Sequence, residues 1–236
     1  MGKPLIPEKS MTLNQRARCR MRFAEDTIKL SKPLMRNSRW SNKSQYLFGK
    51  NDQMFVSGVL SPASNEDGMT LGLKIELSAK PMMADLVHWH AQDLTDNVNQ
   101  PLSFRAAAAH QARSFTMHTW TKTFDDPHPE QAAMALLEGL EIGANEITQK
   151  TSTTPFSEVI KDAGQKRKHA ALYWACLVLE DKMETLVTDI ELYYLETSRN
   201  SDVEATKTFL RKIQKKYISA HESFMKGVDP YWTKTP

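Results

Sequence analysis

The chain opens with a helical pattern of apolar positions. The apolar residues of this stripe recur at steps of three or four and are Leu13, Ala17, Met21, Ala24 and Ile28. Thr12 and Gln15 have the spacing of a capping box, in which each side chain accepts a hydrogen bond from a backbone N–H at the start of a helix. The pattern predicts a helix that begins after Thr12 and ends near Ser31, followed by a linker over residues 32–44.

From residue 45 the apolar period becomes that of β-strands. Aromatic and β-branched residues on either side of a turn at 49–52 predict two short strands between residues 45 and 60. Strict alternation from Met69 to Leu77 is the clearest strand pattern in the chain. The other elements expected in this part are a helix at 82–98, strands at 102–109 and 113–123, and a helix after Pro129.

Two apolar seams with the same 3/4 spacing occupy the last third of the chain. The first seam comprises Leu172, Cys176, Leu179, Met183, Leu186, Ile190 and Tyr193. The second comprises Val203, Thr206, Leu210, Ile213, Tyr217, Ala220 and Phe224. A polar break at 198–201 and a second capping-box match at Ser201 and Glu204 separate them. Two such helices bury their apolar sides by folding back as an antiparallel helical hairpin.

These elements predict an α+β fold. It has an N-terminal helix, a small antiparallel β-sheet of about five strands packed with helices, and a C-terminal antiparallel helical hairpin. We divide the chain into a basic N-terminal arm and helix at 1–44, an α+β body at 45–149 and the hairpin at 150–236.

Charge is distributed unevenly over these three parts. Residues 1–44 hold eleven Lys and Arg against three acidic residues, whereas residues 45–149 hold six against thirteen. A basic head on an acidic body fits a nucleic-acid-binding arm, and it equally fits a head that docks on its own body or on a second subunit. The candidate nucleic-acid-binding residues are Arg16, Arg18, Arg20, Arg22, Arg36, Arg39 and Trp40. Arg16 and Arg20 are placed on one face of the helix, Arg18 and Arg22 on an adjacent one, and Trp40 is available to stack on a base.

Histidines provide the only candidates for metal or acid–base chemistry. His88 and His90 lie two apart in a predicted helix, where they point in different directions, so the spacing argues against a shared metal ion. His118 and His128 lie near Asp125 and Asp126, which is typical of a turn and helix start as well as of a catalytic base. The sequence contains no G-x-S-x-G elbow, no Walker loop, no dinucleotide-binding glycine fingerprint and no H-E-x-x-H motif. We expect a non-catalytic protein without metal or cofactor, although an enzyme of unfamiliar type stays open.

Composition points to an intracellular protein. The longest apolar run, from Ala170 to Leu179, is half of what a membrane-spanning helix needs, so we expect no membrane span. Arginines occupy the part of the chain where a secretory signal would be apolar, and the two cysteines, Cys19 and Cys176, are too few for a disulfide framework. We therefore expect a cytoplasmic protein with free thiols.

The order helix, three strands, helix, two strands, helix over residues 12–149 is similar to that of the bacterial type III secretion chaperones. These are homodimers that hold a segment of an effector protein extended against their sides. The resemblance implies a chaperone-like adaptor that recognises a protein partner, with an extended segment adding to an exposed strand. The hairpin seam is then a partner or dimer interface, formed by Leu172, Leu179, Met183, Leu186, Leu210, Ile213 and Tyr217. The alternative function is nucleic-acid binding by the basic arm.

Overall fold

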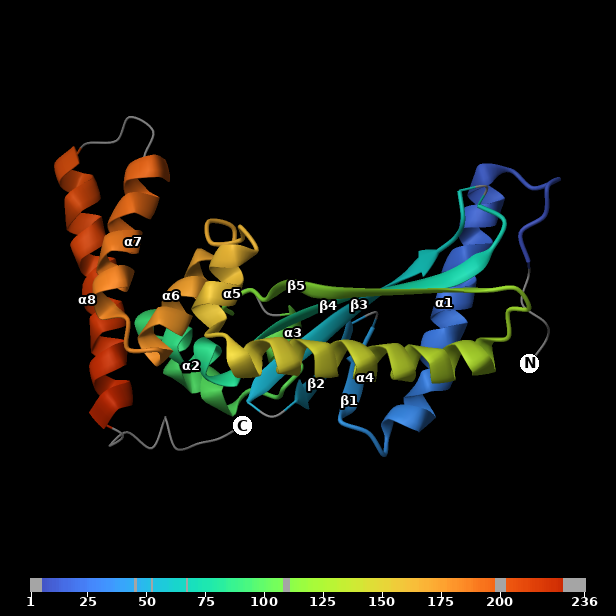
Figure 1. Ribbon diagram of the computed structural model, residues 1–236, viewed down its shortest axis with the longest axis horizontal. Helices are drawn as coiled ribbons and strands as arrows, with labels where there is room; N and C mark the ends of the chain where they lie inside the picture. Colours follow the sequence, from blue (N-terminus) through green and yellow to red (C-terminus); the bar gives the residue numbers. More distant parts are fainter. Residues whose placement is uncertain are drawn as a thin grey trace. The chain divides into compact units, whose positions relative to one another are not determined.

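The computed structural model describes residues 6–44, 46–51, 53–66, 68–107, 111–197 and 203–226, with backbone alone at 107, 197, 203–207 and 209. It confirms the predicted α+β class: an N-terminal helix, a five-stranded antiparallel sheet, and further helices that include a C-terminal hairpin (Figure 1). The chain forms two compact units, Met1–Ala79 with Thr116–Lys150 and Lys80–Phe115 with Thr151–Pro236. Each unit combines two separate stretches of sequence. The division into three contiguous ranges stays a prediction.

The first unit begins with helix α1, Leu13–Met35. The predicted capping box is confirmed, because Thr12 accepts from the Gln15 N–H and the Gln15 side chain accepts from the Thr12 N–H. The predicted end near Ser31 is wrong, since the helix continues through Pro33 to Met35. A proline costs one helical hydrogen bond, and burial of Ser31 and Met35 on the inner face offsets that loss.

Five strands form one sheet in the order β1-β2-β3-β4-β5. The strands are β1 (Trp40–Lys43), β2 (Tyr46–Asn51), β3 (Met54–Ala63), β4 (Leu71–Pro81) and β5 (Phe115–Phe124). The pairs β1/β2 and β2/β3 are antiparallel, with Trp40 opposite Gly49 and Tyr46 opposite Val59. The strand count agrees with the prediction, but its membership differs. Strand β1 lies inside the predicted linker, and residues 104–107 of the predicted strand 102–109 form a short helix instead.

Helix α4, Pro129–Thr153, lies along the sheet in Figure 1 and contacts it through small residues. A Cβ on Gly139 would stand 2.6 Å from the Trp120 ring, and a Cβ on Gly143 would meet Leu77 and His118. Glycine at these positions therefore lets the helix approach strands β4 and β5 closely. Helix α1 packs along β3 and β1. Its Phe23 is in edge-to-face contact with Phe124, the last residue of β5.

The second unit is helical around a core of Trp89, Trp174 and Tyr217. Its elements are α2 (Met82–Ala91), the 3-10 helix η1 (Thr95–Asn99), α3 (Phe104–Ala107), α5 (Phe156–Asp162), α6 (Ala170–Leu179), α7 (Met183–Thr197) and α8 (Val203–Lys226). Helices α2 and α6 pack against each other and against α8. The predicted helix at 82–98 is thus too long, and the chain turns after Ala91.

Helices α2, α5 and α6 end in the same way. The residues Asp93, Gly164 and Asp181 take a positive φ of 56–64°. In each case the next backbone N–H bonds back to the carbonyl five residues earlier, which is a Schellman motif. Glycine normally fills this position, because a left-handed backbone strains other residues. The two aspartates each bond a residue of α8: Asp93 bonds Lys216 and Asp181 bonds His221, both at 2.7 Å.

The turn at Asp181 corrects one prediction and leaves another in place. The single helix expected over 172–193 is wrong, because α6 and α7 are separate. The antiparallel hairpin is confirmed and consists of α7 and α8, drawn in orange and red in Figure 1, with Gln214 donating to the carbonyl of Val187 and to Glu191. The predicted break at 198–201 and the Ser201 side chain of the second capping box lie outside the described residues.

Candidate functional site

Helix α1 carries its basic residues on two opposite faces. Five exposed cations lie on the solvent side and form what we call the cationic stripe: Arg18, Arg22, Lys29, Lys32 and Arg36. With 3.6 residues per turn and a rise of 1.5 Å, they fall within an arc of about 80° and extend over about 27 Å. Glu25 is the one acidic residue inside this row. Apart from a 3.4 Å contact between Lys29 and Asp26, the stripe makes no ion pair within the described part of the chain.

The other two arginines of the helix point toward the buried side. Arg20 donates to the carbonyl of Gly68 at 2.8 Å, and Arg16 donates to the carbonyl of Lys9 at 3.0 Å. Both are half-buried. Successive residues on a helix are separated by about 100°, which places Arg16 and Arg20 each about 160° from Arg18. The faces that the sequence pattern put side by side are therefore opposite one another.

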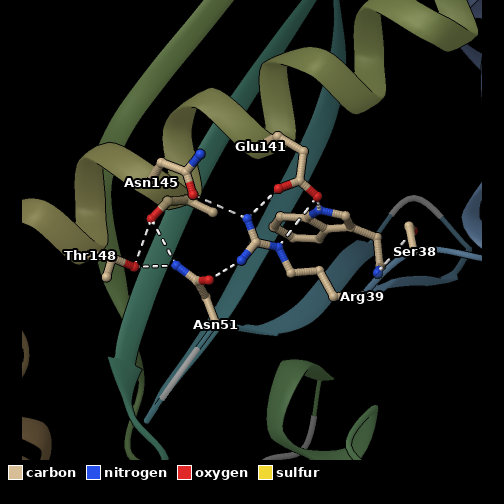
Figure 2. A network of polar contacts seen from close by, with 8 residues as sticks. Ser38, Arg39, Asn51, Glu141, Asn145 and Thr148 are labelled. Carbon is tan, nitrogen blue, oxygen red and sulfur yellow. Dashed lines mark hydrogen bonds and ion pairs between the residues drawn. The ribbon is translucent and has the colours of Figure 1, made fainter.

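Arg39 and Trp40 are held by α4 in a polar cluster on the first unit (Figure 2). The indole N–H of Trp40 donates to Glu141 at 2.7 Å, and the Arg39 guanidinium bonds the same carboxylate and the side chain of Asn51. Asn51 in turn donates to the carbonyl of Ala144 at 3.2 Å. Trp40 is only 2% exposed, so its ring is not available to stack on a base. At Arg39, the basic arm docks on the acidic body of the same chain.

Strand β5 is one edge of the sheet. It is ten residues long, whereas the opposite edge strand, β1, has four. Its exposed residues are Thr116, Thr119, Thr121, Lys122 and Thr123. The carbonyl oxygen of Lys122 lies beside Gly72 of β4, so the backbone N–H and C=O of Lys122 point toward β4. In antiparallel pairs the N–H and the C=O of one residue point to the same neighbour, and the adjacent residue points the other way. The backbone of Thr121 and Thr123 thus faces the open edge.

The residues of the predicted interface seam pack mostly inside the second unit. Leu172, Leu186, Leu210 and Tyr217 are buried there, and Leu179, Met183 and Ile213 are half-buried. Burial raises the pKa of the Tyr217 hydroxyl above its ordinary range. The exposed apolar residues of the hairpin are others, chiefly Leu195 at 67% and Met225 at 58%. An interface between copies through the seam residues stays a prediction.

The histidines of interest each have a partner of their own. His88 lies 3.4 Å from the Tyr217 hydroxyl, His118 pairs with Glu146 at 2.8 Å, and His128 with Asp126 at 3.1 Å. His88 and His90 are both on α2, as predicted. Among the described residues no three His, Cys, Asp or Glu side chains gather in a way that could hold a metal ion.

The most completely buried charges form a cluster that the sequence pattern did not reveal. Lys80 at the end of β4 bonds Asp85 at 2.7 Å, and Arg105 bonds the second oxygen of Asp85 at 3.1 Å. Lys80 also donates to the carbonyl of Ala112 at 2.9 Å and to the Gln111 side chain. Burial lowers the pKa of Lys80, although the Asp85 carboxylate opposes this shift. The cluster joins Arg105, Gln111 and Ala112 to Lys80 and Asp85, which is a structural task.

No sequence signal singles out this cluster, because Lys80, Asp85 and Arg105 share no spacing that indicates contact.

Of the described helices, none is long and apolar enough to cross a membrane. No protein family, no curated protein and no solved structure matches this chain. The element order that resembled type III secretion chaperones also differs, since four strands precede α2 and one follows it.

Proposed function

We propose that this protein is a non-catalytic, adaptor-like binding protein that takes up an extended segment of a protein partner along the free edge of β5. The observation that carries the proposal is the contrast between the two edges of the sheet. Natural proteins protect sheet edges by keeping them short, by proline, by bulges or by charge. Strand β1 follows this rule with four residues, whereas β5 presents ten residues with no proline and one lysine.

The exposed side chains of β5 suit such a role. Thr119, Thr121 and Thr123 are small, uncharged and β-branched, so they favour an extended backbone and leave the main-chain groups accessible. An added strand gains its affinity from main-chain hydrogen bonds, and its specificity comes from alternate side chains. Helix α4 contacts Trp120 and His118 on one face of β5, and the threonines, whose side chains alternate with these, are exposed.

The test uses a photoreactive residue at position 119 to attach the partner in cells, followed by mapping of the attached segment. The segment is then synthesised, and its affinity for the intact chain is measured. Thr121→Pro removes an outward N–H without breaking a bond to β4, so we expect at least a tenfold loss of affinity. Thr121→Ala keeps the N–H and serves as the matched control, with affinity close to that of the native chain.

Two results would overturn this function. Equal loss in Thr121→Pro and Thr121→Ala would mean that the side chain, and not the main chain, binds the partner. A native chain that is a dimer by light scattering and becomes a monomer in Thr121→Pro would mean that a second copy occupies the edge. The thermal unfolding of each variant is recorded by circular dichroism, so that a misfolded protein is recognised as such.

A further inference from the structure

The cationic stripe of α1 is a surface that the proposed function does not use. Its five cations lie opposite the buried face of the helix, where Phe23, Thr27 and Ser31 pack into the first unit. This opposition means that the whole row is presented to solvent by a helix whose position is fixed by its other side. A row of cations held rigid over about 27 Å matches a ligand that is itself a stiff, regular row of negative charges.

We infer that the cationic stripe binds the phosphate backbone of double-stranded DNA without reading its sequence. A DNA duplex carries a phosphate on each strand about every 3.4 Å along its axis, so the stripe spans about eight base pairs. The major groove of B-form DNA, about 12 Å wide, admits an α-helix, whereas that of an RNA duplex is too narrow.

Single-stranded nucleic acid fits this surface less well. Proteins that bind single strands combine a basic groove with aromatic side chains on which bases stack. The aromatic residues nearest to the stripe in sequence are Phe23, which is in the core, and Trp40, which is buried against Glu141. The stripe is therefore a surface of charge alone. Binding through charge alone is sequence-independent and strongly dependent on salt.

The salt dependence gives a quantitative expectation. If all five cations neutralise phosphates, the slope of log K against log salt is about −4.5, and a rise from about 50 to 200 mM salt weakens binding about 500-fold. Neutralising two of them by Arg18→Gln with Arg22→Gln lowers the slope to about −2.7 and the loss to about 40-fold. Removing the acidic residue by Glu25→Gln tightens binding about two- to five-fold.

A matched control is available on another helix. Arg211 and Lys215 of α8 are also exposed cations separated by four residues. Arg211→Gln with Lys215→Gln makes the same change in net charge at the same spacing. We expect this control to keep the affinity and the salt slope of the native chain.

The experiment is a fluorescence-anisotropy titration of the intact chain with a labelled 20-base-pair DNA duplex, its single strand and an RNA duplex of the same sequence. We expect the DNA duplex to bind most tightly, with the slopes given above. Each of four results would overturn the inference: no salt-sensitive binding of the duplex, an equal effect of the α8 control, tighter binding of either other nucleic acid, or displacement of the duplex by poly-glutamate at equal charge. The last would assign the stripe to an acidic polypeptide.

Discussion

The ammonium of Lys80 lies 2.7 Å from a carboxylate oxygen of Asp85, and both side chains are completely buried. Arg105 adds a second cation to the same carboxylate. We expect Asp85→Asn to lower the free energy of unfolding by about 3–5 kcal/mol, because it leaves two buried cations without their counter-charge. Lys80→Met removes one cation and keeps the Asp85–Arg105 pair, so its cost is smaller. Urea unfolding followed by tryptophan fluorescence measures both, and a larger loss in Lys80→Met would contradict the expectation.

The bond between Trp40 and Glu141 provides a second prediction. Trp40→Phe keeps most of the buried ring and removes only the N–H donor, so we expect a loss of about 1 kcal/mol. Trp40→Ala also removes the packing and should cost about 3–5 kcal/mol. Glu138→Gln, an exposed change on the same helix, is the control and should have no measurable effect. Denaturant unfolding in which Trp40→Phe equals the native chain would show that this hydrogen bond contributes nothing net.

Gly139 of α4 is expected to resist replacement despite its place inside a helix. Alanine is a better helix former by about 1 kcal/mol. However, its Cβ would stand 2.6 Å from the Trp120 ring, and overpacking typically costs about 1–3 kcal/mol. We therefore expect Gly139→Ala to lower the melting temperature, whereas Glu138→Ala next to it leaves the melting temperature unchanged. A stabilised Gly139→Ala variant would mean that the sheet can shift to accommodate the methyl group.

We expect His169 to make the free energy of unfolding depend on pH. Its side chain is 5% exposed and its Nδ1–H donates to the carbonyl of Arg113 at 2.9 Å. Burial lowers the pKa of His169 below its ordinary value of 6.5, although the hydrogen bond to the Arg113 carbonyl opposes this shift. The unfolded chain then takes up a proton at a higher pH than the folded chain.

The contribution of His169 is therefore present above about pH 6.5 and is lost as the pH falls through the folded pKa. His169→Asn keeps a donor near the position of Nδ1 and cannot take up a proton. We expect the free energy of unfolding of this variant to fall less than that of the native chain between about pH 7 and pH 5. Parallel curves for the two proteins in urea unfolding at several pH values would contradict this.

The sequence predicted correctly those helices and strands that depend on contacts between residues close together in the chain. The capping box at Thr12 and Gln15 and the alternation from Leu71 to Leu77 depend on neighbours a few residues apart, and both are confirmed. The break between α6 and α7 was missed because the 3/4 spacing of apolar residues continues across it. The turn is made by Asp181 in a left-handed conformation, where glycine would have been the usual signal.

The candidate surfaces were predictable only in part for a similar reason. Helical spacing separates Arg18 and Arg22 from Arg16 and Arg20, but the predicted apolar stripe of α1 does not mark its buried face, because Leu13 and Met21 are 77% and 49% exposed. Helical spacing also does not reveal that Trp40 is bonded to a carboxylate 101 residues away in sequence, and this long-range contact is what removes the aromatic ring from the surface. The exposure of the β5 edge likewise depends on the order of strands in the sheet, which no single strand encodes.

The way in which the chain divides into two units limits how the protein can be dissected. Each unit is made of two stretches, and the crossings fall within β4, at the start of β5 and near the end of α4. No contiguous fragment contains one whole unit and nothing of the other. A truncated chain that begins at residue 45 or stops at residue 149 therefore removes part of a unit. Studies of either unit alone call for a linker that joins its two stretches directly or for two co-expressed pieces that reassemble.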